Sequence, residues 1–470
     1  MLYRLESDSV GEKQVPKDAY YGVQTLRAYE NFRITGRRIN PELVKALAQI
    51  KKAAAITNMG IELLNRKIGN AIVKSCDEIM EGKFHDEFIT DPIQGGAGTS
   101  INMNANEVIA NRAIEILGGE KGDYSIVHPN DHVNMGQSTN DVIPTGGKIA
   151  TIRLLEKAME ELDNLVLVLM EKSKEFDHVI KMGRTQMQDA VPIRLGQEFK
   201  AYADVIKRDI MRIKRAKEDL NCVSIGATAI GTGLNADEEY VRNITPNLCE
   251  VTGLELKQCE DLVDGTQNLD TFAAVSGTLK VCAINISKIS NDLRLLSSGP
   301  RTGFGEINLP AKQNGSSIMP GKVNPVIPEV VNQVAFNIIG NDMTITMAAE
   351  AGQLELNAFE PVIYYNLFES IETLTNGVNT FIENCIKGIT ANEKRCKDLV
   401  ENSVGIITAI CPHVGYKASA RIAKTAIKTG ESVRELILKE GLLKEADMEV
   451  IFDPYGMTKP GISGKQLLKK

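Results

Sequence analysis

The placement of proline is the feature of this 470-residue chain that most constrains its fold. Proline is excluded from the interior of helices, so a long stretch without it permits a long helix. Five stretches of about fifty residues contain none: 42–91, 145–191, 193–245, 247–299 and 362–411. The proline pattern therefore predicts a mainly helical protein.

Apolar residues within these stretches recur with helical spacing, in steps of three and four residues. The four series are Ile152, Leu155, Met159, Leu162, Val166 and Leu169; Ile206, Ile210, Ile213 and Leu220, with a gap at Lys217; Val275, Leu279, Cys282, Ile286, Ile289, Leu293 and Leu296; and Leu367, Ile371, Leu374, Val378, Phe381 and Cys385. A period near 3.5 favours nearly parallel packing, with crossing angles of about +20°. We therefore expect an all-α protein built around a central bundle of long helices.

The proline and apolar patterns also suggest a division into domains. We expect an N-terminal, mainly helical domain at 1–140, a central long-helix bundle domain at 141–393 and a small C-terminal helical domain at 394–470. Each of the four apolar series would form a stripe along its helix, here called a seam. In the first predicted helix, Leu165, Leu167 and Val168 widen the apolar surface beyond the seam that begins at Ile152. A helix that is apolar on more than one face needs neighbours on both sides. The chain is therefore expected to oligomerise through the bundle.

Charge and hydropathy exclude several classes of partner. The net charge of −7 provides no basic surface for nucleic acid or for a membrane. The first residues contain no apolar signal region, and no stretch approaches 18 uncharged apolar residues. These features predict a cytoplasmic protein with neither a nucleic-acid nor a membrane partner.

The cysteines and histidines offer little support for a metal or disulfide framework. The eight cysteines are scattered and form no Cys-x-x-Cys pair, so we expect buried free thiols in a reducing cytoplasm. His128 and His132 are four residues apart, but Pro129 follows the first of them and weakens a helical two-histidine metal site. Surface or capping roles are favoured for both histidines, and we expect no metal and no cofactor.

The segment 315–325, GSSIMPGKVNP, concentrates hydroxyl, ammonium and amide groups between glycines and prolines. Glycine permits close backbone approach, so neighbouring N–H groups can converge on an anion. A phosphate-binding P-loop is excluded, because five residues separate Gly315 from Gly321 and Val323 follows the lysine. A surface turn would also explain the composition. The alternative is an electropositive loop that holds a serine as an alkoxide base.

Three further polar segments interrupt the helical pattern, at 95–106, 134–141 and 183–189. Each one alone is expected to cap a helix, since Ser, Thr, Asn and Asp favour N-caps. Together with the loop they indicate a polar pocket for an anionic substrate. The neutral donors that they supply are Thr99, Ser138, Thr139, Asn140, Thr185 and Gln186.

Taken together and in this order, the four segments resemble those of the aspartase/fumarase superfamily, and the resemblance covers essentially the whole chain. It implies an all-α protomer of three domains. It also implies a homotetramer whose core contains twenty helices, five from each subunit, with each active site built from three subunits. A helical scaffold protein would explain the apolar seams and the oligomer, but not the four polar segments.

The resemblance also implies roles for individual residues. Ser316 matches the family's general base, on a mobile loop that spans 303–322 and has glycine hinges. Free serine is too weakly acidic to ionise near neutrality, so its oxyanion would need Lys322, backbone amides and loop closure. The matching substrate-binding residues are Thr99, Ser138 and Thr139 around the β-carboxylate, Lys322 and Asn324 around the α-carboxylate, Asn140 and Thr185 near the amino group, and Ser317 and Gln186 in the same site.

The implied reaction is the reversible anti elimination of ammonia from L-aspartate to give fumarate, through an aci-carboxylate intermediate. The alternative is a class II fumarase, which interconverts malate and fumarate. Fumarases carry histidine where this chain has Gln186, and glutamine cannot relay a proton to hydroxide. The segments 96–100 and 138–140 also look like those of aspartate ammonia-lyases. Residues 128–131 resemble a region that forms a second, peripheral dicarboxylate site in fumarases.

Overall fold

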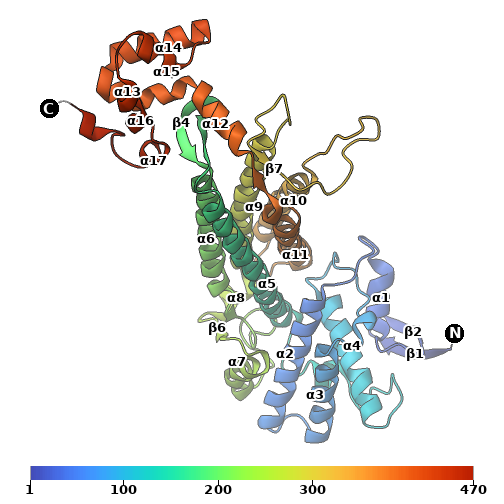
Figure 1. Ribbon diagram of the computed structural model, residues 1–470. Helices are drawn as coiled ribbons and strands as arrows, with labels where there is room; N and C mark the ends of the chain where they lie inside the picture. Colours follow the sequence, from blue (N-terminus) through green and yellow to red (C-terminus); the bar gives the residue numbers. More distant parts are fainter. Residues whose placement is uncertain (1, 469–470) are drawn as a thin grey trace. The chain divides into compact units, whose positions relative to one another are not determined.

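The computed structural model describes residues 2–468, and within them the protein is mainly helical (Figure 1). The α-helices are α1 (Val23–Asn31), α2 (Pro41–Gly60), α3 (Arg66–Met80), α4 (Thr99–Ile116), α5 (Thr139–Glu175), α6 (Leu195–Asp219), α7 (Glu238–Thr252), α8 (Leu262–Gln267), α9 (Asp270–Leu296), α10 (Val326–Glu350), α11 (Glu360–Asn384), α12 (Glu393–Asn402), α13 (Ile407–Val414), α14 (Tyr416–Thr429), α15 (Val433–Lys439), α16 (Glu445–Ile451) and α17 (Pro454–Met457). Shorter helical turns are η1 (His85–Glu87), η2 (Pro129–Val133), η3 (Ile386–Gly388), η4 (Val404–Ile406) and η5 (Lys465–Leu467). The expectation of an all-α protein is confirmed.

Four small two-stranded sheets accompany the helices within the described residues. Their strands are β1 (Tyr3–Asp8) with β2 (Gly11–Pro16), β3 (Ile180–Thr185) with β4 (Gln188–Arg194), β5 (Cys222–Val223) with β6 (Lys257–Gln258), and β7 (Ile307–Asn308) with β8 (Thr390–Ala391). The β5–β6 pair is parallel and the other three pairs are antiparallel. None of these sheets is large enough to form a core of its own.

Five helices of 25 or more residues, α5, α6, α9, α10 and α11, occur between residues 139 and 384. This agrees with the predicted central set of long helices. The seam predicted along α9 is buried at all seven of its positions, from Val275 to Leu296, and so is the seam along α11 from Leu367 to Cys385. The apolar spacing therefore identified the buried faces of these helices correctly.

One long helix lies outside the proline-free stretches. Helix α10 carries Pro328 in its first turn, and α5 begins five residues before Pro144. The first four N–H groups of a helix have no intrahelical partner, so Pro328 removes no helical hydrogen bond. The stretch 42–91, in contrast, contains two helices, α2 and α3, rather than one.

The chain divides into two compact units, and each long helix contributes residues to both. Unit 1 contains the residues up to Glu160, together with Asp209–Ala283 and Ala335–Thr375. Unit 2 contains Glu161–Arg208, Ile284–Val334 and the residues from Asn376 onward. The finer division into three domains, with boundaries after residues 140 and 393, stays a prediction.

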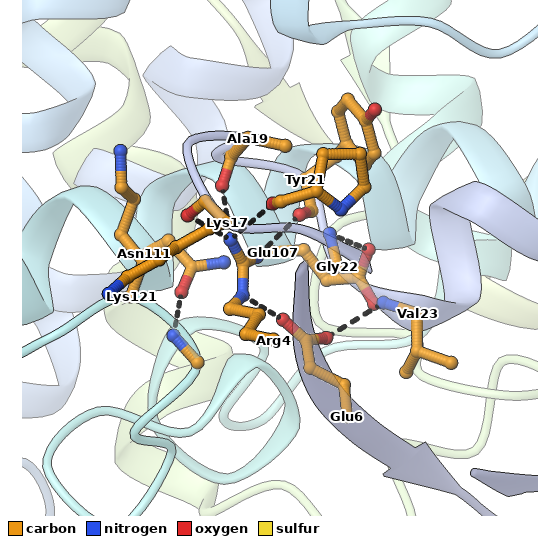
Figure 2. Close-up of polar contacts among 12 residues, drawn as sticks. Arg4, Glu6, Lys17, Ala19, Tyr21, Gly22, Val23, Glu107, Asn111 and Lys121 are labelled. Atoms are coloured by element: carbon orange, nitrogen blue, oxygen red, sulfur yellow. Dashed lines mark hydrogen bonds and ion pairs between the residues drawn. The ribbon is translucent and has the colours of Figure 1, made fainter. Parts of the chain in front are cut away.

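The N-terminal hairpin of unit 1 is fastened by two buried carboxylates and one arginine (Figure 2). Glu107 accepts the N–H groups of Gly22, at 2.8 Å, and of Gln24, at 3.0 Å, so that its negative charge lies at the start of α1. Arg4 donates to Glu6 at 2.7 Å, to the carbonyl group of the last residue of β2 and to three carbonyl groups of the segment that follows β2. Burial raises the pKa of Glu107 to about 7. These contacts fix the chain entering α1.

Among residues 2–468, α9 is the one helix whose length and composition would allow it to cross a membrane. Its seven seam residues are buried against other parts of the protein, as expected for a core helix. The eight cysteines are all free thiols, as predicted. The expectation that they are buried holds for Cys76, Cys282, Cys385 and Cys396, whereas the other four are partly exposed.

Candidate active site

The polar segment 134–141 forms the start of helix α5, in unit 1. The Ser138 hydroxyl accepts the N–H of Asn140 at 3.2 Å, and the Ser138 N–H donates to Asp141 at 2.9 Å. The Asn140 side chain donates to the Ala229 carbonyl at 2.7 Å. The capping role expected for this segment is confirmed, and Thr139, the first residue of the helix, is half-buried beside it.

Asp141 is a fully buried carboxylate beneath this helix start. It also accepts the N–H groups of Gly226, at 3.1 Å, and Thr228, at 3.0 Å. Burial raises the pKa of Asp141 to about 6, although these hydrogen bonds oppose the shift. Asp141 therefore joins the turn at 226–228 to the segment that carries Ser138, Thr139 and Asn140.

Lys51, in the middle of α2, is the second buried charge at this place. Its ammonium group donates to the side-chain oxygens of Asn134 at 2.8 Å and Gln137 at 2.9 Å. Burial lowers the pKa of Lys51 to about 7, and the nearby Asp141 charge opposes the shift. Asn102 then donates to Asn134 at 3.2 Å and to the Thr139 hydroxyl at 3.3 Å. A chain of polar contacts thus runs from Lys51 to Thr139.

The segment 95–106 supplies a second helix start close to the first. Thr99 is the exposed first residue of α4, and Gly98 before it has a left-handed backbone with φ of 82°. A Cβ atom at Gly98 would lie 3.0 Å from the Ile143 side chain of α5, so this position requires glycine. The positive ends of two helix dipoles therefore lie near one another, an arrangement that favours an anion.

The third polar segment, 183–189, is not a helix cap as expected. It forms the turn of the β3–β4 hairpin in unit 2, where Thr185 pairs with Gln188. Gln186 and Met187 at the tip have positive φ angles of 53° and 63°. Two such residues in succession are typical of a type I′ hairpin turn, whose twist matches that of the strands. The turn leaves the Thr185 and Gln186 side chains exposed.

The loop between β7 and α10, also in unit 2, carries the segment 315–325 and closes on itself at its base. The Gly315 N–H donates to the Lys322 carbonyl at 2.8 Å, and the Asn324 side chain donates to the Gly315 carbonyl at 2.7 Å. A Cβ atom at Gly315 would lie 2.5 Å from the Lys322 carbonyl oxygen. Glycine is therefore required where the two sides of the loop meet.

The Ser316 hydroxyl lies just inside this closure. Its oxygen accepts the backbone N–H groups of Ile318 at 3.2 Å and Met319 at 3.0 Å. Two donors directed at one hydroxyl oxygen would stabilise negative charge on it. Ser316 is half-buried, whereas Ser317 and Lys322 are exposed.

The structure gathers the predicted site residues into two groups. Unit 1 holds Thr99, Ser138, Thr139 and Asn140, at the starts of α4 and α5. Unit 2 holds Thr185, Gln186, Ser316, Ser317, Lys322 and Asn324, on a hairpin and a loop. Their roles in substrate binding and catalysis stay predictions. Lys51 was not predicted from the sequence, although a lysine among the Ala, Leu and Ile residues of 46–56 could have indicated it.

Comparison with known proteins identifies the family. A model of a family described as Lyase matches residues 11–340, and a model of the fumarase C C-terminus matches residues 406–459. Aspartate ammonia-lyase of Bacillus subtilis (strain 168) is 59% identical over 468 residues, which cover 100% of this chain and 98% of that protein. The chain belongs to the lyase family. The predicted resemblance to the aspartase/fumarase superfamily is confirmed.

Solved structures of lyase-family proteins share the fold. The fumarate lyase:delta crystallin from Brucella melitensis bound to cobalt has a TM-score of 0.96 and 49% identity, over 98% of this chain and 100% of that chain. The class II fumarase from Schistosoma mansoni has a TM-score of 0.94 and 37% identity, over the same shares of the two chains. A fumarate lyase and a class II fumarase therefore share this fold. The fold alone does not distinguish the two activities, so the distinction must come from the site residues.

The two histidines near the second polar segment of this lyase-family chain are structural, as the sequence suggested. The His128 ring accepts the N–H groups of Asn130 and Asp131, both at 3.2 Å, and so caps the short helix η2. The His132 ring accepts the N–H of His128 at 2.8 Å. Burial lowers the pKa of His132. A peripheral dicarboxylate site at residues 128–131 stays untested.

Proposed function

We propose that this chain is an aspartate ammonia-lyase, which catalyses the reversible anti elimination of ammonia from L-aspartate to give fumarate. The observation that carries the proposal is the 59% identity, over the whole chain, to the enzyme of that name from Bacillus subtilis. The class II fumarase from Schistosoma mansoni is 37% identical. Gln186, at the exposed tip of the β3–β4 hairpin, also favours an aspartate ammonia-lyase over a fumarase. Its side chain cannot titrate, so it cannot donate a proton to a leaving hydroxide.

Ser316 is the proposed general base. Its oxyanion removes a proton from the carbon beside the β-carboxylate of aspartate, and the electron pair enters that carboxylate to form the aci-carboxylate. The Ile318 and Met319 amides, which donate to the Ser316 oxygen, support this role because they would stabilise the oxyanion. The electron pair then returns to form the C=C bond of fumarate while the C–N bond breaks.

The proposed partners of the β-carboxylate are Thr99, Ser138 and Thr139. Neutral donors aimed at developing negative charge contribute about 3–4 kcal/mol each in comparable oxyanion sites. The two helix starts that carry these residues add positive partial charge. Buried Lys51 and Asp141 hold this part of the protein in place, so the donors would need little rearrangement when the charge develops.

Lys322→Met should weaken the binding of aspartate, of fumarate and of a non-reactive dicarboxylate inhibitor. Lys322 is the proposed partner of the α-carboxylate, and its exposed side chain is free to reach a ligand. Removing a charged partner of this kind commonly reduces affinity by about 10- to 100-fold. The measurement is inhibitor titration of both proteins at equal ionic strength. Unchanged affinity would make Lys322 a structural residue of the loop.

Class II fumarase is the second candidate, favoured by the TM-score of 0.94 to the Schistosoma enzyme. In aspartate the amino group is already protonated and leaves as ammonia, so an acid at position 186 is not required. Elimination of hydroxide from malate does require a proton donor. Nuclear magnetic resonance of fumarate incubated with the protein and ammonium separates the two: aspartate is expected as the product, and malate as the main product would contradict the proposal.

Gln186→His should not convert the protein into an efficient fumarase. A histidine would titrate near neutrality and supply a proton relay, but residues 96–100 and 138–140 would keep the form expected for an aspartate ammonia-lyase. We expect aspartate deamination to survive at a reduced rate, with at most trace malate dehydration. The comparison is kcat/KM for both substrates in both proteins. A preference for malate in the variant would show that position 186 alone sets specificity.

We further propose a homotetramer with a twenty-helix core and active sites shared between subunits. Apolar side chains that a single chain leaves exposed support this: Phe336, Met343 and Met347 on α10 and Leu167 on α5 are 62%, 63%, 65% and 62% exposed. Exposed apolar patches on helices mark contact surfaces. The free thiols fit a reducing compartment, and we place the protein in the cytoplasm.

A further inference from the structure

Four charged side chains meet inside unit 2, at the junction of the β3–β4 hairpin and the segment that leads into the loop. The Glu306 side chain is 0% exposed and that of Lys181 is 2% exposed. A single nitrogen of Arg184, Nη1, donates to both carboxylate oxygens of Glu306 at 3.0 Å. Lys181 lies 3.3 Å from Glu306 and 2.9 Å from Glu198. Two cations and two carboxylates thus form one buried cluster.

The cluster joins two segments that carry proposed site residues. Arg184 immediately precedes Thr185, at the end of β3. Glu306 immediately precedes β7, after which the chain enters the loop that carries Ser316. The Arg184 guanidinium also lies over the Phe304 ring, 4.1 Å from its centre. Arg184 therefore contacts the stem of the loop at two separate points.

The backbone of Glu306 is fixed as firmly as its side chain. Its N–H donates to the Leu296 carbonyl at 2.9 Å, and its carbonyl accepts the Asn392 N–H at 2.9 Å. These contacts tie the loop stem to the end of α9 and to the segment before α12. A displacement of Arg184 would therefore be transmitted to a rigid stem, not absorbed by a loose chain.

Burying charges is a poor way to gain stability, since apolar side chains of similar size often stabilise a protein at least as well. The Arg184 contacts do fix the position of the guanidinium group, because its Nη1 lies between the two oxygens of a fully buried carboxylate while the group lies over the Phe304 ring. We propose that Arg184 and Glu306 are positioning residues, which hold the hairpin turn carrying Thr185 and the stem of the loop carrying Ser316 in fixed positions within one subunit, from which the proposed tetramer delivers the two residues to different active sites. This inference rests on the proposed function for the roles of Thr185 and Ser316.

The predicted consequence is a loss of turnover greater than the loss of binding. Small misplacements of reacting groups reduce rates by as much as about 100-fold. The proposed β-carboxylate partners, Thr99, Ser138 and Thr139, lie in unit 1, outside the segments that the cluster joins. Breaking the cluster should therefore lower kcat by about 10- to 100-fold. The Kd of a non-reactive dicarboxylate inhibitor should rise by a smaller factor, because Lys322 lies on the displaced loop but the β-carboxylate partners do not.

The test compares Arg184→Met, Glu306→Leu and the double variant in the full-length protein. Arg184→Met leaves Glu306 with Lys181 as its remaining cation, and Glu306→Leu removes the carboxylate that Arg184 contacts, so both Tm and kcat should fall. The double variant replaces the pair with apolar groups and leaves Lys181 paired with Glu198. Its Tm should return towards that of the wild type while kcat stays at least about tenfold low. Recovery of kcat together with Tm would overturn the proposal.

Arg184→Lys provides a version of the test that does not depend on the double variant folding. It keeps the positive charge but loses the planar guanidinium group, which contacts Glu306 through Nη1 and lies over the Phe304 ring at the same time. We expect a folded protein with kcat lowered at least about fivefold. The matched control is Arg194→Met, which removes a 3.0 Å ion pair with Asp177 at the other end of the same hairpin and should leave kcat unchanged. Wild-type kcat in Arg184→Lys would overturn the proposal.

Hydrogen–deuterium exchange without substrate tests the coupling independently of catalysis. Arg184→Met should increase exchange both in residues 185–188 and in residues 309–325, whereas Arg194→Met should increase it in neither. Unchanged exchange in the loop would overturn the positioning role. Suppose that Arg184→Met increases exchange in both segments but the wild type forms no fumarate from aspartate. The positioning role then stands and the proposed function fails.

Discussion

Ser316→Ala should lower kcat for aspartate deamination by about 10²–10⁴-fold, the usual contribution of a general base. The substitution removes the oxygen that receives the Ile318 and Met319 amides and leaves the helices untouched. The Gly315 closure of the loop, formed by backbone and Asn324 contacts, does not involve the serine hydroxyl. Circular dichroism, Tm and oligomeric state should therefore remain those of the wild type.

Ser317→Ala is the matched comparison, because it deletes a hydroxyl from the neighbouring residue of the same loop. Ser317 is exposed and its proposed role is substrate binding, so this variant should raise KM more than it lowers kcat. If Ser316→Ala retained more than about a tenth of the wild-type activity, Ser316 would be excluded as the base. The base would then have to be sought elsewhere in the site.

Two inactive variants should regain activity when their subunits are mixed. Ser316→Ala lacks the proposed base, and Thr185→Val lacks a proposed contact near the amino group. If each active site takes these two residues from different subunits, some sites in a mixed tetramer contain neither substitution. With random exchange in a symmetric tetramer, roughly a quarter of the sites would be intact.

The exchange must be verified before activity is measured, for example by native mass spectrometry of one isotope-labelled variant. Each variant exchanged with itself is the control and should stay inactive. Absence of recovery in verified hybrids would mean that one subunit supplies both residues to the same site. Dissociation of the tetramer should also abolish activity, since the two groups of site residues would then no longer meet across subunits.

The sequence predicted the helical core well, because burial of helices depends on a local repeat. The seam from Val275 to Leu296 is buried at every predicted position in α9. Helix α10 was not identified by the proline rule, since Pro328 lies in its first turn, where proline is tolerated. The β3–β4 hairpin was not predicted because its turn uses Gln186 and Met187, neither of which signals a type I′ turn.

The candidate site was predicted as a set of residues, but not as a set of supporting contacts. Ser316 and Lys322 were identified from a dense local motif and its family resemblance. Lys51 and Asn134 are 83 residues apart in the chain, and Arg184 and Glu306 are 122 residues apart. No local pattern links such partners, because only the fold brings them together. The buried charges beneath the site could therefore be found only in the structure.

The central claim is that this protein eliminates ammonia from aspartate. The direct measurement is the ultraviolet absorbance of fumarate, recorded with the wild-type protein after addition of L-aspartate and, separately, of L-malate. We predict that absorbance rises with aspartate and stays level with malate, and that Ser316→Ala abolishes the rise. A rise with malate alone would identify a fumarase, and no rise with either substrate would contradict the account.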